Sequence, residues 1–165
     1  MAARALRVRW VAGTRWVVLA GLVLPWAAGV IGPARAQRSL VDEPTLHALA
    51  ARGEPTRIAQ AIAKGVPVDV RDQDGRTPLH LAAKEAHLFA VMMLIAKGAN
   101  VNARDHDRRT PLHVAAGGDP KLDGERYQIV KLLMAKGADR AARDAQDNRP
   151  VDYATRPEIR KVLEP

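Results

Sequence analysis

Three histidines recur at one interval and are the first candidates for chemistry in this chain. His47 and His80 lie 33 residues apart, as do His80 and His113. Imidazole is a common transition-metal ligand, so the column is a candidate metal site. A zinc ion, however, needs ligands at about 2 Å, whereas equivalent side chains on stacked helices lie about 10 Å apart. One ion cannot bridge the column, so we expect no metal site and a structural role for these residues.

Other catalytic residue types are scarce. The chain has no cysteine, which excludes disulfides, thiolate metal sites and cysteine nucleophiles. Ser39 is the only serine, and there is no G-x-S-x-G, HExxH or glycine-rich phosphate loop. The acids Asp119, Asp123 and Glu125 do not have the spacing of a calcium-binding loop. The sequence therefore predicts a protein that is not an enzyme and that holds no metal or cofactor.

The histidines belong to an internal repeat, which must supply the elements that position them. Gly65 and Gly98 are also 33 residues apart, whereas Gly98 and Gly137 are 39 apart, so one copy carries six extra residues. These fall within residues 117–126, which we expect to form a surface loop between two helices. Self-similarity at such a period is typical of solenoid proteins.

Each copy has the same local pattern. Thr77-Pro78 and Thr110-Pro111 are typical helix starts, because threonine caps free N–H groups and proline at the first helical position loses no hydrogen bond. A second apolar stretch follows at 91–95 and 129–134, ending in Lys-Gly, a pair suited to a helix C-terminus. An extended polar link then leads to a turn, such as Gln73-Asp74-Gly75-Arg76.

These residues resemble the ankyrin repeat family, whose signature is T-P-L-H-x-A. The resemblance rests on TPLHLAA at 77–83, KGANVNARD at 97–105, TPLHVAA at 110–116 and KGADRAARD at 136–144. It implies an all-α solenoid of about four helix-turn-helix repeats with projecting β-turn fingers. It also implies that the recurring histidine ties the turn by hydrogen bonding.

The predicted repeat domain covers residues 44–165, with copies at about 44–72, 73–105, 106–144 and 145–165. The first and last copies depart from the pattern, as terminal caps do; Asp152, for example, stands where the others have histidine. Arg108 and Asp147 replace the glycine of the finger turn, so those two fingers either differ in shape from the first or keep its shape with backbone strain.

The resemblance places partner-binding residues at the fingertips and at the end of an inner helix. The charge along this ridge is mixed, which favours a polar protein partner over a polyanion. Interface hot spots are enriched in Trp, Tyr and Arg, so Arg76, Arg108 and Arg109 are the preferred anchors. The predicted partner-binding residues are Gln73, Asp74, Arg76, Lys84, Glu85, His106, Asp107, Arg109, Gln146 and Asn148.

The N-terminal segment predicts export. Residues 1–36 hold five arginines and no acid, and residues 16–34 carry no charge. A basic start, an apolar run and Ala34-Arg35-Ala36 are typical of a secretory signal peptide, so we expect cleavage after Ala36, a flexible lead-in at 37–43 and a periplasmic or secreted protein. An uncleaved membrane anchor is the alternative, because a spanning helix needs about 20 apolar residues.

Net charge bears on a second class of partner, nucleic acid. The formal charge of +8 falls to +3, or 21 bases against 18 acids, once residues 1–36 are set aside. Nucleic-acid binding is therefore the weaker alternative to a non-catalytic, monomeric protein-binding module. The resemblance further implies one specific role, support of a periplasmic enzyme such as catalase, although nothing in these residues selects it.

Overall fold

The computed structural model describes residues 16–19, 22–25, 44–117 and 123–164. The chain divides into two compact units, Met1–Glu43 and Pro44–Pro165. In the first unit, β1 (Trp16–Leu19) pairs antiparallel with β2 (Leu22–Pro25), with Leu19 opposite Leu22. The predicted cleavage site after Ala36 and the lead-in at 37–43 lie outside the described residues. Among the helices described, none has the length and apolar character needed to cross a membrane.

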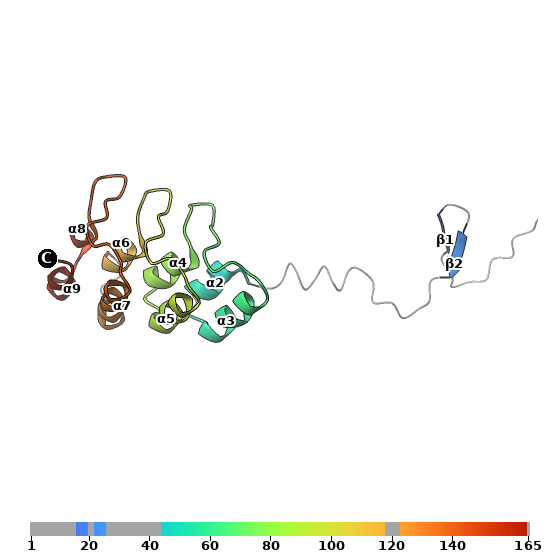
Figure 1. Ribbon diagram of the computed structural model, residues 1–165, viewed down its shortest axis with the longest axis horizontal. Helices are drawn as coiled ribbons and strands as arrows, with labels where there is room; N and C mark the ends of the chain where they lie inside the picture. Colours follow the sequence, from blue (N-terminus) through green and yellow to red (C-terminus); the bar gives the residue numbers. More distant parts are fainter. Residues whose placement is uncertain (1–15, 20–21, 26–43, 118–122, 165) are drawn as a thin grey trace, which may run out of the picture. The chain divides into compact units, whose positions relative to one another are not determined.

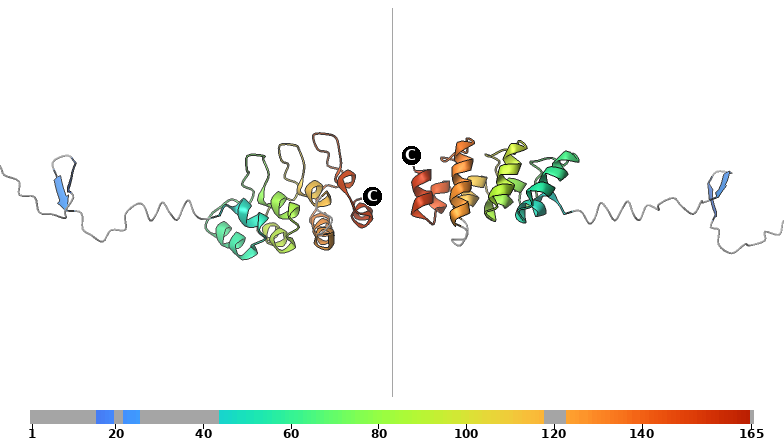
Figure 2. Two further views of the ribbon diagram at one scale, coloured as in Figure 1. Left: turned by 180° about the vertical axis from the view of Figure 1, so that it is seen from behind. Right: turned by 90° about the horizontal axis from the view of Figure 1, so that it is seen from below.

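The second unit consists of stacked helix pairs (Figures 1 and 2). The pairs are α2 (Leu46–Ala51) with α3 (Pro55–Ala63), α4 (Pro78–Lys84) with α5 (Leu88–Ala96), α6 (Pro111–Ala116) with α7 (Asp123–Ala135), and α8 (Pro150–Tyr153) with α9 (Pro157–Leu163). The inner helices α2, α4, α6 and α8 contact one another in sequence, and so do the outer helices α3, α5, α7 and α9. This confirms the predicted helical solenoid.

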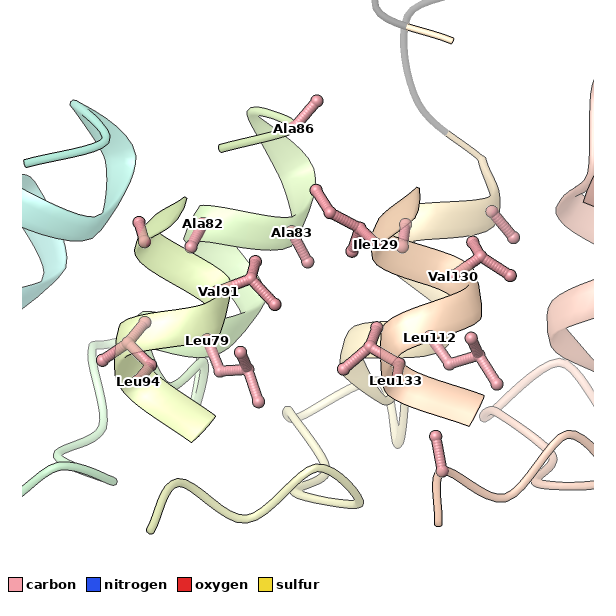
Figure 3. Close-up of a cluster of buried hydrophobic side chains, with 14 of the residues drawn as sticks. Leu79, Ala82, Ala83, Ala86, Val91, Leu94, Leu112, Ile129, Val130 and Leu133 are labelled. Carbon is pink, nitrogen blue, oxygen red and sulfur yellow. The ribbon is translucent and has the colours of Figure 1, made fainter. Parts of the chain in front are cut away.

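One apolar core runs along the stack, built from equivalent residues of successive copies. Leu79 and Leu112 occupy matching places in two adjacent pairs, as do Leu94 and Leu133 (Figure 3), and all four are fully buried. Burying one leucine contributes about 1.5–3 kcal/mol. Alanine at position 83, also fully buried, lets the inner helices approach closely. The repeat in the sequence is thus a repeat of the core.

The six extra residues lengthen a helix as well as a connection. We expected a surface loop over 117–126, but α7 already begins at Asp123 and runs for 13 residues, against nine in α3 and in α5. The loop prediction is therefore wrong for residues 123–126, while 118–122 lie outside the described residues. Because α7 begins early, Arg126 lies within the helix, whereas the prediction had placed it in a surface loop.

Candidate partner-binding groove and fingertips

The finger that follows each outer helix is closed by one aspartate. Asp72 Oδ1 accepts the backbone N–H groups of Asp74 and Arg76, both at 2.9 Å, and the Asp72 N–H donates to the Arg76 carbonyl. Burial by itself raises the pKa of Asp72, but these hydrogen bonds and the Arg76 guanidinium hold it below its usual range. Asp144 closes the third finger in the same way, accepting the N–H groups of Gln146 and Asn148. In the second finger Asp105 accepts the Arg109 N–H and donates its own N–H to the Arg109 carbonyl.

All three fingers have the same turn. Gly75, Arg108 and Asp147 occupy equivalent places with φ of 73°, 61° and 67°, and each donates its N–H to the carbonyl of the closing aspartate. Of the two alternatives, the second and third fingers therefore keep the shape of the first. Hydrogen bonds hold Arg108 in the left-handed conformation, which is unfavourable for a residue with a side chain. The second finger therefore has the same turn as the first and carries backbone strain at Arg108.

Neighbouring fingers are bonded to one another near their tips. The His106 N–H donates to the Asp74 carbonyl at 3.0 Å, and the Ala145 N–H donates to the Asp107 carbonyl at 2.8 Å. The His106 ring also covers Gly75, where an added Cβ would lie 2.5 Å from its Cδ2 atom. The fingers project side by side from the helices (Figure 1). The fingers thus form a row of turns, each closed by its own hydrogen bonds and each hydrogen-bonded to its neighbour.

The recurring histidines connect each inner helix to the next finger. Nδ1 of His80 accepts the Thr77 N–H at 3.1 Å, so the ring hydrogen is on Nε2, which donates to the Arg109 carbonyl at 3.1 Å. His113 repeats this with Thr110 and Asn148. Both ring nitrogens are thus occupied, leaving no lone pair for a metal. Burial lowers the pKa of His80 and of His113, against the hydrogen bonds to the carbonyls, which raise it.

A cavity of about 470 Å³ lies between the fingers and the inner helices. It brings together four of the predicted partner-binding residues, namely Arg76, Lys84, Glu85 and Arg109. We call this cavity the groove. Its remaining lining residues are His80, Leu81, Asp105, His113, Val114, Gly117, Arg126 and Tyr153.

The other predicted residues are outside the groove. Gln73, Asp74, His106, Asp107 and Gln146 are exposed at the fingertips. Asn148 is half-buried and serves the scaffold, since its carbonyl accepts from His113 and its N–H donates to Asp144.

Two arginines at the groove are held in place by their own fingers. Arg76 Nε pairs with Asp72 at 2.9 Å, and Arg109 Nε pairs with Asp105 at 3.3 Å. Their Nη2 atoms pair with the fingertip carboxylates of Asp74 and Asp107, at 2.6 and 2.7 Å respectively. Arg108, the third predicted anchor, is exposed and does not line the groove.

Sequence reasoning missed Arg126 and Tyr153. Arg126 is 2% exposed, and its Nη2 donates to the Lys84 carbonyl at 2.6 Å. The Tyr153 hydroxyl donates to Asp144 Oδ2 at 2.5 Å, and its pKa is raised by that hydrogen bond and by burial. Tyr153 could have been found by register, because it stands in the last copy where Leu81 and Val114 stand in the middle copies. Arg126 could also have been found by register, because it stands where His87 stands in the preceding copy, and the two side chains bond the equivalent carbonyls of Lys84 and Ala51.

The comparisons agree with this geometry. A family model of ankyrin repeats, built as three copies, matches residues 46–144. The chain therefore belongs to the ankyrin repeat family.

Similar curated proteins come from plants. Acyl-CoA-binding domain-containing protein 1 of Arabidopsis thaliana is 38% identical over 38% of this chain and 20% of its own length. Acyl-CoA-binding domain-containing protein 4 of Oryza sativa subsp. japonica is 46% identical over 28% of this chain and 14% of its own. The chain thus covers a fifth or less of these relatives, and the similarity lies in their ankyrin repeats.

Proposed function

We propose that this protein is a non-catalytic module that binds a polar protein surface through its groove and fingertips. The observation that carries the proposal is the hydrogen bonding between adjacent fingers, in which the His106 N–H donates to Asp74 and the Ala145 N–H donates to Asp107. A preorganised surface loses little conformational entropy on binding. The acyl-CoA named in the plant relatives is not proposed as a ligand, because the similarity is confined to their repeats.

The experiment is affinity capture with the whole chain as bait. A fingertip variant, Gln73→Ala with His106→Ala and Gln146→Ala, changes only exposed side chains. A matched control, Thr56→Ala with Gln60→Ala and Gln128→Ala, changes exposed side chains of the outer helices. We expect the control to retain a captured protein that the fingertip variant loses. Equal capture by both would contradict binding at the fingertips.

Export is a second part of the proposal, supported by the Arg-rich start and the uncharged run at 16–34. N-terminal sequencing of the protein recovered from its cells tests it. Gln37 as the first residue supports a cleaved, exported module. Met1 retained on a membrane-bound chain would favour the tethered alternative.

A further inference from the structure

The groove has a charge and a shape that specify the partner more closely, and this inference rests on the proposed function. Its lining contains four cationic residues, Arg76, Lys84, Arg109 and Arg126, against the two acids Glu85 and Asp105. Asp105 is committed to the scaffold, because it is 7% exposed and accepts the Arg109 N–H at 2.8 Å. Arg126 is likewise committed to the scaffold, because it is 2% exposed and donates to the Lys84 carbonyl. The charged residues left at the surface of the groove are the three cations Arg76, Lys84 and Arg109 against the acid Glu85, which lies 3.9 Å from Lys84.

The two finger arginines are presented in the same way in consecutive copies. Asp72 and Asp105 hold the Nε side of each guanidinium, and their side chains are 20% and 2% exposed. The Nη2 side meets fingertip carboxylates, of which Asp74 is 65% and Asp107 55% exposed. Ion pairs as exposed as these contribute little. An incoming carboxylate can therefore replace them while the inner pair keeps the guanidinium oriented.

An apolar column lies beside these arginines. Leu81, Val114 and Tyr153 are half-buried, one in each of three successive copies, and all line the groove. Gly117 leaves room for the tyrosine, because an added Cβ would lie 3.2 Å from Tyr153 Cβ. A ligand that fits must place acidic groups toward the fingers and apolar groups toward the inner helices.

We propose that the groove binds an acidic segment of a partner protein, whose carboxylates take the Nη2 sides of Arg76 and Arg109 from Asp74 and Asp107. Equivalent groups of adjacent copies lie about 10 Å apart. A polyproline II chain rises about 9 Å in its three-residue turn, so acids three residues apart match the two arginines. Glu85 and the exposed fingertip acids oppose a continuous polyanion, which favours a peptide over a nucleic acid.

The test is a binding titration of the whole chain with synthetic peptides. The probe is a capped 12-residue peptide of Glu-Leu-Ala repeats, compared with its Gln-Leu-Ala twin and with an isomer whose glutamates are clustered. We expect the Glu-Leu-Ala peptide to bind at least about tenfold more tightly than the Gln twin, and to weaken as salt rises. The clustered isomer should bind less tightly than the spaced one.

Two variants separate the proposal from other uses of the same groove. Lys84→Glu changes an exposed side chain and should weaken peptide binding about tenfold or more. Asp74→Asn with Asp107→Asn removes the competing carboxylates and should strengthen it by about threefold to tenfold. A strengthened complex is the result that a scaffold role for these aspartates does not produce.

Three results would overturn the proposal. They are equal binding of the Glu and Gln peptides, weaker binding after the Asn substitutions in a chain with unchanged circular dichroism, and tighter binding of a 12-nucleotide oligothymidylate than of the acidic peptide. If the acidic peptide fails while the whole chain still captures a protein through its fingertips, this inference falls and the proposed function stands.

Discussion

The imidazole of His80 joins two copies of the repeat, because its Nε2 donates to the carbonyl oxygen of Arg109, 29 residues further along the chain, at 3.1 Å. The same ring accepts the Thr77 N–H through Nδ1. One side chain therefore fixes the start of α4 and the base of the next finger together.

His80→Ala should strongly destabilise the fold. It removes a ring that is 1% exposed, and it leaves the Thr77 N–H and the Arg109 carbonyl without this partner. We expect a loss of about 3 kcal/mol in the free energy of unfolding, measured by urea titration. His106→Ala is the control, because that side chain is exposed, and it should change stability by less than about 0.5 kcal/mol. Similar losses for both variants would contradict the role given to His80.

Stability should fall as the pH is lowered through the histidine range. The pKa of His80 and of His113 is lowered in the folded chain, chiefly by burial, whereas an unfolded histidine titrates near 6.5, as a rough reference value. Below that pH the unfolded chain binds protons that the folded chain does not. The free energy of unfolding should therefore be flat above about pH 7.5 and decline below about pH 6.5.

Urea midpoints measured from pH 5 to pH 8 check this. The double variant His80→Gln with His113→Gln, which has no ring to protonate at these positions, should lose the decline. The aspartates whose pKa is lowered, Asp72, Asp144 and Asp152, add a second loss only below about pH 4.

Arg108→Gly should stabilise the protein. Arg108 has φ 61° in a finger whose first copy uses Gly75 at φ 73°. Glycine relieves left-handed strain of about 1–2 kcal/mol and gives back part of that as greater freedom of the unfolded chain. The urea midpoint should rise, by a net gain of about 0.5–1 kcal/mol. Ala145→Gly, at an exposed finger position without positive φ, should not raise it.

Gly75→Ala should cost more stability than Gly98→Ala. Both glycines have positive φ, 73° and 89°, so both variants carry backbone strain. At Gly75, however, an added Cβ would lie 2.5 Å from the His106 ring, while at Gly98 it meets nothing within 4 Å. Thermal unfolding of the two variants measures the difference. Equal melting temperatures would mean that the His106 ring moves aside freely.

The repeat made the fold predictable. The 33-residue interval and the Thr-Pro-Leu-His segments located the middle helix pairs, because each copy buries the same residues against its neighbours. The structure also gathers Arg76, Lys84, Glu85 and Arg109 at the groove. Their use by a partner stays a prediction.

What the sequence could not supply depends on contacts between copies. Arg126 stands where the preceding copy has His87, and it donates to the Lys84 carbonyl as His87 bonds the Ala51 carbonyl, but the change of residue type and the insertion before it hid this equivalence. The shape of the second finger depended on whether its hydrogen bonds outweigh the strain at Arg108. An arginine at position 108 is unfavourable in this turn, but the hydrogen bonds donated to Asp105 stabilise it.

The bonds of the three recurring histidines point one way along the stack, whereas His87 and Arg126 bond back to carbonyls of the preceding copy, those of Ala51 and Lys84. His47 donates to the finger base at Arg76, His80 to the one at Arg109 and His113 to the one at Asn148, while Asp152 turns back to accept the Arg149 N–H. A pulling force that detaches the last copy removes no anchor from the fingers that remain. A force that detaches the first copy removes His47, which anchors the next finger at Arg76, and the same kind of loss follows as each further copy detaches. Loss of a copy from the N-terminal end therefore removes the histidine that anchors the next finger, whereas loss of a copy from the C-terminal end removes the side chain that bonds the end of the preceding inner helix, so unfolding from the two ends breaks different bonds.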